Sequence, residues 1–147
     1  FTHFVPHVDT AHRGLSQLGP ASRRACMGAL LTAGTTILEP MLAIEIRVPT
    51  DLVGNVATVL SGKRGKVLDM VQKGASSIIV GEIPAAETFT LSEAMRGQTA
   101  GRATWNTSFK AWTELPKSIA TTAIAEIRKR KGLAPEPPGI DEYIDRE

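Results

Sequence analysis

The sequence has almost no cysteine, because Cys26 is its only thiol among 147 residues. A single thiol excludes an intramolecular disulfide framework and is typical of a reducing compartment. No apolar run approaches the roughly 20 residues that a membrane-spanning helix needs. The chain also does not open with the basic and then apolar segments of a secretory signal. We therefore expect a cytoplasmic protein that makes no contact with a membrane.

Glycine-rich nucleotide motifs are missing as well. A phosphate-binding loop reads GxxxxGK[ST], and the nearest approach to it is Gly62-Lys63-Arg64. No glycine stands five positions before Gly62, and Arg64 replaces the hydroxyl residue that would bind magnesium. No GxGxxG pattern is present either. The sequence thus excludes both common nucleotide sites, and we expect no cofactor or metal in this chain.

Size and charge set wider bounds on the protein. A chain of 147 residues suits one domain or slightly more, and can bury about 70% of its extended surface. Because the chain begins with Phe1 and not methionine, we expect a processed protein or a fragment. Residues 133–147 carry five acids and one arginine, so with +2 overall the first 132 residues carry +6. A basic body favours a polyanionic partner, although an ordinary solvated surface has the same composition.

Hydrophobic periodicity predicts an α+β fold. Segments with a period of two alternate with segments at helical spacing, in the order β-α-β-β-α-β. This order is typical of the ferredoxin-like split βαβ fold, an antiparallel sheet with both helices on one face. The predicted strands cover 41–48, 66–72, 77–83 and 102–111, and the predicted helices cover 20–33, 52–62, 90–97 and a segment after residue 116 that ends near 131.

Local signals refine these elements. Pro20 suits the first position of a helix, and Gly34 offers a left-handed stop after it. Asp51 follows Pro49-Thr50 and predicts a helix cap.

Trp105 shares the alternation of Phe109 and is expected in the core. An RNA-recognition module of the same topology needs aromatic residues on its two central strands, and the strands over 41–48 and 77–83 have none.

The chain's three histidines all lie within its first twelve residues, and two of them fall in the segment HVDTAHRG, residues 7–14. Three interpretations stay open from the residues alone. His7, Asp9 and His12, with His3 nearby, supply nitrogen and oxygen ligands for a metal. Asp9 could instead orient an imidazole for acid–base catalysis. The simplest interpretation is an exposed polar loop in which Asp9 turns the backbone.

Two basic clusters lie at predicted helix ends. Lys63, Arg64 and Lys66 stand among glycines, where cations either contact nucleic-acid phosphates or complement the helix dipole, an effect of about 0.3–1 kcal/mol. The run from Arg128 to Lys131 has the same two explanations. Neither cluster identifies a partner by itself.

Several ordered blocks resemble one family. ILEPMLAIEIRVP, GKRGKVLDMVQKG, IPAAETF and MRGQTAGRATW are similar to the last domain of translation elongation factor 2 of the archaeal and eukaryotic type, usually numbered V. HVDTAHRG, followed by LSQLGPASRRACMGALL, is similar to the end of domain IV. The resemblance implies residues 1–39 from domain IV, a ferredoxin-like domain V over 40–114, and a C-terminal helix with an acidic tail over 115–147.

The resemblance also implies a modified residue. In this family the histidine before Arg-Gly is converted to diphthamide, and by motif match that residue is His12. His7 and Asp9 match positions that present the loop to the diphthamide-synthesis enzymes. Arg13 is expected to contact RNA, and Gly14 to let the backbone turn closely. The sequence departs from the family at Ala11 and Leu15, and neither change removes the target imidazole.

The implied partner is the ribosome. The loop would enter the decoding region and contact the tRNA–mRNA helix, while Lys63, Arg64 and Lys66 would contact ribosomal RNA. The chain itself would be non-catalytic, because GTP and magnesium belong to a GTPase domain that it lacks. The alternatives are a freestanding ferredoxin-like module that binds RNA or a small molecule, and a metal hydrolase based on the histidines.

Overall fold

The computed structural model describes residues 5–143, so His3 lies outside the described residues. The described residues form two compact units. The sheet unit is Ile37–Leu115, and the terminal unit combines the residues up to Thr36 with those from Pro116 onward. The predicted segments 1–39, 40–114 and 115–147 stay a prediction, because compact units within this chain do not assign its residues to the domains of a family.

A four-stranded antiparallel sheet forms the centre of the sheet unit, which confirms the predicted ferredoxin-like α+β fold. The strand order is β2-β3-β1-β4, so the two crossovers place β1 beside β3 in the middle. Both central strands have the apolar alternation that the sequence predicted. The strands are β1 (Leu38–Pro49), β2 (Lys66–Lys73), β3 (Ser76–Pro84) and β4 (Thr104–Glu114).

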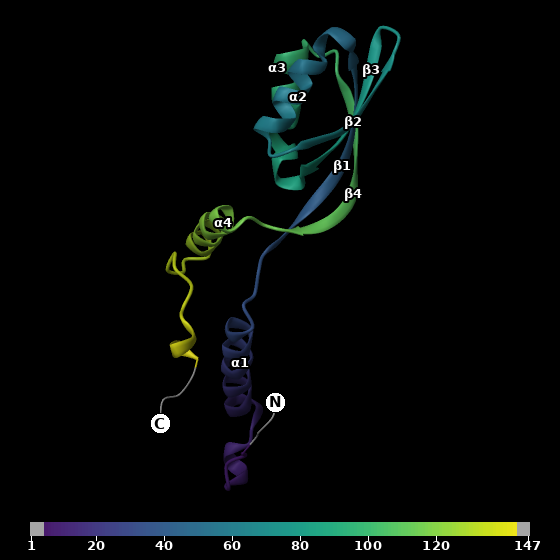
Figure 1. Cartoon of the computed structure of the whole chain (residues 1–147). Helices are drawn as coiled ribbons and strands as arrows, with labels where there is room; N and C mark the ends of the chain where they lie inside the picture. Colours follow the sequence, from purple (N-terminus) through teal and green to yellow (C-terminus); the bar gives the residue numbers. More distant parts are fainter. Residues whose placement is uncertain (1–4, 144–147) are drawn as a thin grey trace. The chain divides into compact units, whose positions relative to one another are not determined.

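Two helices cover one face of this sheet. They are α2 (Val53–Gly62) and α3 (Leu91–Thr99), and both lie on the same side of the strands (Figure 1). Their apolar residues pack against every second residue of the central strands, which produces one hydrophobic core. The fully buried residues include Ile44, Ile46, Val48, Val56, Leu60, Ile79, Ile83, Leu91 and Met95.

Trp105 packs against this core, as predicted, but Phe109 does not. The side chain of Phe109 is 58% exposed, and that of Trp112 is 62% exposed. Their rings lie 5.9 Å apart between centroids. The period-two pattern predicted the correct face of β4. It could not show that the side chain of Phe109 stays largely exposed on that face.

Tight turns connect the elements of the sheet unit. Arg64 has a left-handed backbone, with φ of 53°, at the turn between α2 and β2. Gly65 follows it in a crowded place, because a Cβ there would lie 2.9 Å from the carbonyl oxygen of Leu60. Gly74 has φ of 63° in the hairpin between β2 and β3, a backbone conformation that glycine adopts without strain.

The first helix starts earlier than predicted. Helix α1 (Leu15–Thr32) contains Pro20 in its interior, so the expectation that Pro20 opens the helix was wrong. Gly14 is the N-cap, and its carbonyl already accepts the amides of Gln17 and Leu18. Pro20 lacks an N–H and removes one helical hydrogen bond, but the turns on both sides of it still form. Gly34 has φ of 71° just beyond the helix end, as predicted.

The predicted cap at Asp51 was also wrong. Residues Thr50–Leu52 form a 3-10 turn, η2, and α2 begins after it without a side-chain cap hydrogen bond. The carboxylate of Asp51 lies 3.7 Å from the guanidinium of Arg102 instead. The cap pattern failed because the extra 3-10 turn moves the helix start beyond the reach of Asp51.

The C-terminal part of the terminal unit contains α4 (Lys117–Arg130) and the 3-10 turn η4 (Ile140–Glu142). Pro116 is the N-cap of α4, and none of the described residues of this helix is buried.

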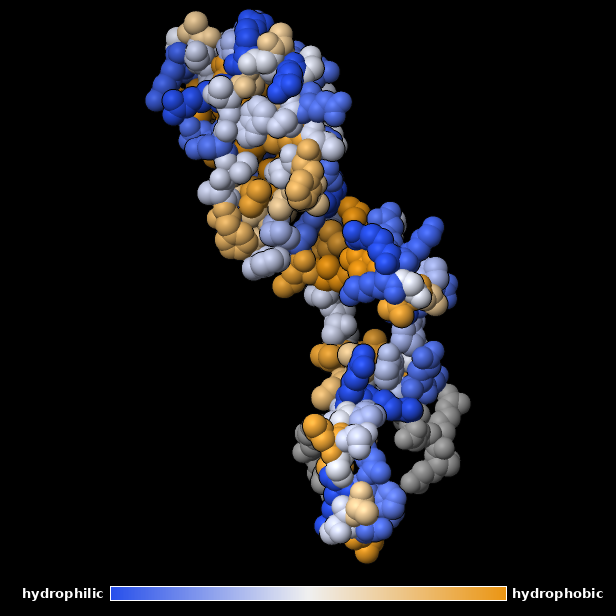
Figure 2. Space-filling model, turned by 180° about the vertical axis from the view of Figure 1, so that it is seen from behind, coloured by the Kyte–Doolittle hydropathy of each residue, from blue (hydrophilic) through white to orange (hydrophobic). Residues whose placement is uncertain are grey.

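Figure 2 shows orange hydrophobic patches between blue hydrophilic ones on the surface. Among the residues that the structure describes, no helix is long and apolar enough to cross a membrane.

Candidate functional site

The histidine loop ends in a 3-10 turn just before α1. This turn is η1 (Thr10–His12), and Asp9 is its N-cap. The side chain of Asp9 accepts a hydrogen bond from the amide of Ala11 at 2.9 Å. Asp9 therefore turns the backbone, which agrees with the simplest interpretation of the sequence. The turn places the imidazole of His12 at the surface, with 55% of its side chain exposed.

Asp9 also contacts both histidines of the loop. Its backbone amide donates to Nδ1 of His7 at 3.1 Å. Its second carboxylate oxygen lies 3.4 Å from Nδ1 of His12. The centroids of the two imidazole rings are 4.7 Å apart, and the rings are tilted by 53°. The structure thus gathers His7, Asp9 and His12 into one exposed cluster.

Arg13 ties the two ends of the loop together. Its Nε donates to the carbonyl of His7 at 2.7 Å, and its Nη2 donates to the carbonyl of Val8 at 3.0 Å. The sequence predicted that Arg13 contacts RNA, which stays a prediction, and it gave no sign of these bonds. Gly14 has an ordinary extended backbone, with φ of −67°, so it does not provide the close turn that we expected there.

The geometry limits the chemistry of this loop. Within residues 5–143, no three histidine, cysteine or acidic side chains are grouped so that they could hold a metal ion. His12 and Asp9 are both more than half exposed. An exposed imidazole beside a carboxylate can be approached by a macromolecule or a modifying enzyme.

The predicted basic cluster divides into two parts. Arg64 turns inward, where its Nη1 and Nη2 donate to both oxygens of Glu39 at 2.9 Å. Its Nε donates to Glu87 at 3.0 Å. The hydrogen bond to Glu39 raises the pKa of Arg64 above its usual value, so the guanidinium stays charged. Arg64 is 29% exposed, which leaves little of it for an RNA contact.

Lys63 and Lys66 form the other part of the cluster, and Lys63 is half-buried. The Nζ of Lys63 donates to the hydroxyl of Thr90 at 2.5 Å. Lys66 begins the edge strand β2 and is exposed. The sequence could not separate these lysines from Arg64, because the left-handed turn at Arg64 decides which side chain points inward.

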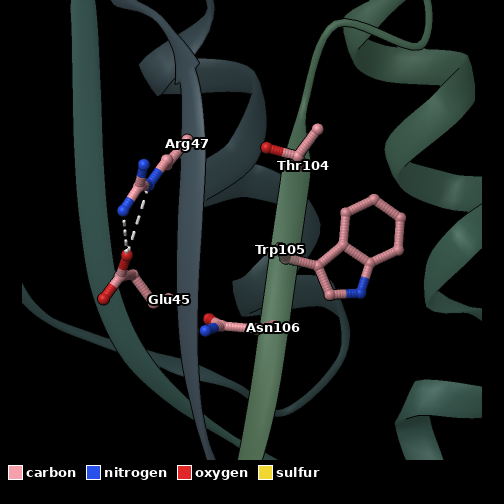
Figure 3. A pocket seen from close by; sticks show the side chains of 5 residues that line it. All are labelled: Glu45, Arg47, Thr104, Trp105 and Asn106. Atoms are coloured by element: carbon pink, nitrogen blue, oxygen red, sulfur yellow. Dashed lines mark hydrogen bonds and ion pairs between the residues drawn. The ribbon is translucent and has the colours of Figure 1, made fainter.

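The sheet also carries a shallow depression that the sequence did not predict. Its volume is about 280 Å³, and Glu45, Arg47, Thr104, Trp105 and Asn106 line it. Arg47 donates to Glu45, and the indole of Trp105 points away from this pair (Figure 3). The polar half of the β4 alternation was the signal that could have predicted it. Because Arg47 and Glu45 neutralise each other, the depression offers little net charge to a ligand.

Comparison with known proteins adds evidence from related sequences. Residues 36–123 match the family model described as elongation factor G C-terminus. Elongation factor 2 of Cenarchaeum symbiosum (strain A) is 76% identical over 147 residues, which is 100% of this chain and 20% of that protein. Elongation factor 2 of Metallosphaera sedula is 48% identical over 138 residues, which is 94% of this chain and 19% of that protein.

A solved structure agrees with these matches. A crystal structure of a protein from Thermus thermophilus is similar with a TM-score of 0.58 and 32% identity, over 62% of this chain and 14% of that one. The present chain spans about a fifth of the length of the curated relatives it matches.

Proposed function

The chain belongs to the elongation factor G C-terminus family, and we propose that it acts as the ribosome-binding C-terminal part of an elongation factor 2. The resemblance drawn from the sequence motifs is confirmed at the level of the family. The observation that carries the proposal is 76% identity over the whole chain to an archaeal elongation factor 2. In the parent factor, this part would support the GTP-dependent translocation of tRNA and mRNA.

His12 is the expected diphthamide site. Three features of the loop support this assignment. The imidazole is exposed, it is held on a capped 3-10 turn, and the turn leads directly into the 18-residue helix α1. A helix is a stiff support, so a group at its start can be carried to a distant partner without bending. We assign contact with the diphthamide-synthesis enzymes and the tRNA–mRNA helix to this loop.

The RNA-facing surface of the sheet unit is assigned to Lys63 and Lys66. Lysine side chains neutralise phosphates and release counterions, which gives affinity without sequence specificity. Arg64 supports this surface indirectly, because its bonds to Glu39 and Glu87 offset one of two negative charges that would otherwise repel RNA. GTP hydrolysis is assigned to other parts of a full-length factor.

Co-sedimentation with archaeal ribosomes tests this function. The whole chain should pellet with ribosomes at low salt and be released as the salt concentration rises, because phosphate contacts depend on released counterions. A chain with the same composition but a scrambled sequence over 37–115 provides the control for nonspecific charge. Pelleting that does not differ between the two chains would contradict the proposal.

A further inference from the structure

The geometry points to Asp9 and Arg13 as positioning residues that hold His7 and His12 in opposite neutral tautomers. This inference rests on the proposed function, in which His12 is the modified residue. It concerns how the unmodified loop presents its imidazole to the modifying enzyme. The two histidines lie five positions apart, yet their rings are 4.7 Å apart between centroids.

The tautomer of His7 follows from a backbone contact. The amide of Asp9 donates to Nδ1 of His7 at 3.1 Å. A ring nitrogen accepts a hydrogen bond only when it carries no proton, so the proton of the neutral His7 ring must lie on Nε2. A proton on Nδ1 would place two hydrogen-bond donors, the ring N–H and the amide of Asp9, against each other, and this contact would break.

The tautomer of His12 follows from the side-chain carboxylate of Asp9. An ionised carboxylate is only an acceptor. Oδ2 of Asp9 lies 3.4 Å from Nδ1 of His12, so the carboxylate favours a proton on that nitrogen. Oδ1 is occupied by the amide of Ala11, which fixes the direction of the carboxylate. The neutral His12 ring therefore keeps Nε2 as an acceptor for a donor group of the modifying enzyme.

Arg13 makes this arrangement possible by tying the chain back on itself. Its planar guanidinium reaches the carbonyls of His7 and Val8 with two different nitrogens. A lysine ammonium has no such fork, although it has the same charge. Arg13 thus holds the backbone that carries His7 close to the turn that carries His12, and it acts on His12 through Asp9 and His7.

Nuclear magnetic resonance on the whole unmodified chain tests the inference. The chain is made in a bacterial host with ¹⁵N-labelled histidine and a His3→Gln background, and its ring nitrogens are measured at alkaline pH. His7→Gln and His12→Gln assign the two signals. We expect the proton on Nε2 in His7 and on Nδ1 in His12. The same tautomer in both rings would overturn the proposal.

Matched variants separate positioning from folding. Asp9→Asn keeps an oxygen for the amide of Ala11 but removes the charge, and the Nδ1–H to Nε2–H ratio of His12 should fall roughly threefold. Arg13→Lys should weaken the preference of His7 for a proton on Nε2, whereas Arg23→Lys on α1 should change the tautomer ratio of neither ring. An unchanged His12 ratio in Asp9→Asn would overturn the role of Asp9. Absence of the modification from native protein would refute the proposed function and leave the tautomers as they are.

Discussion

At the scale of single residues, Arg64 joins three separate segments of the sheet unit. Its guanidinium binds Glu39 on β1 and Glu87 in the 3-10 turn η3 (Ala85–Thr90), while its backbone forms the turn after α2. Glu39 is only 13% exposed, so little solvent would screen its carboxylate if Arg64 were removed. A partly buried pair of this kind contributes little net stability while it is intact, but it is costly to break from one side.

Arg64→Met should therefore destabilise the sheet unit. We expect a loss of about 2 kcal/mol in the free energy of unfolding, less than for a fully buried pair because Arg64 still touches solvent. Urea denaturation followed by circular dichroism measures it. Arg47→Met is the matched control, because it breaks the exposed pair with Glu45 and should cost less than about 0.5 kcal/mol. Equal effects of the two substitutions would contradict this role of Arg64.

Gly65 gives a second prediction at this scale. Gly65→Ala would place a Cβ 2.9 Å from the carbonyl of Leu60 and 3.1 Å from that of Glu82. Because both neighbours are backbone atoms, we expect a loss of about 1–3 kcal/mol in denaturant unfolding. Gly97→Ala is the control, since its Cβ meets open space inside α3 and should stabilise by up to about 1 kcal/mol. A neutral Gly65→Ala would show that the turn can relax.

At the scale of elements, periodicity predicted more than the local signals did. The four strands and their order along the chain were predictable, because period-two alternation reports which residues face the core. The start of α1 was not predictable from Pro20, because the helix already begins at Leu15, after the Gly14 N-cap. The cap of α2 was not predictable from Asp51, because Thr50–Leu52 form a 3-10 turn before the helix. The contacts of Arg13 and Arg64 could not be read from the sequence, since they depend on how the backbone folds back.

Lys63 in the turn and Lys66 at the start of β2 give a prediction for ribosome binding. Lys63→Glu with Lys66→Glu should lower the affinity of the chain for ribosomes roughly tenfold at low salt and reduce its salt dependence. Co-sedimentation over a salt series measures both quantities. Lys73→Glu with Lys117→Glu changes the net charge equally, outside the proposed surface. If both pairs weaken binding to the same extent, net charge and not this surface governs the contact.

At the scale of the whole molecule, the two units differ in how much they bury. The sheet unit contains the hydrophobic core. In the terminal unit, Gly28 is the one buried residue among those described in α1, and α4 has none among its described residues. Local stability follows buried apolar contacts and protected hydrogen bonds, so the units should not be equally stable.

Hydrogen exchange should separate the units. We expect the amides of α1 to exchange at least about a hundredfold faster than those of β1 and β3, because few buried contacts oppose their local opening. Mass spectrometry of peptides from the exchanged whole chain measures this difference. Uniform protection across α1 and the central strands would show that the units unfold together.

The central claim for the whole molecule is that His12 is modified in the living cell. Tandem mass spectrometry of the peptide that contains residues 7–13, taken from protein of the native source, tests it directly, because fragmentation assigns an added mass to one residue. We predict that His12 carries the added mass of diphthamide and that His7 in the same peptide does not. A native peptide in which His12 is unmodified, or in which His7 carries the added mass instead, would contradict this claim.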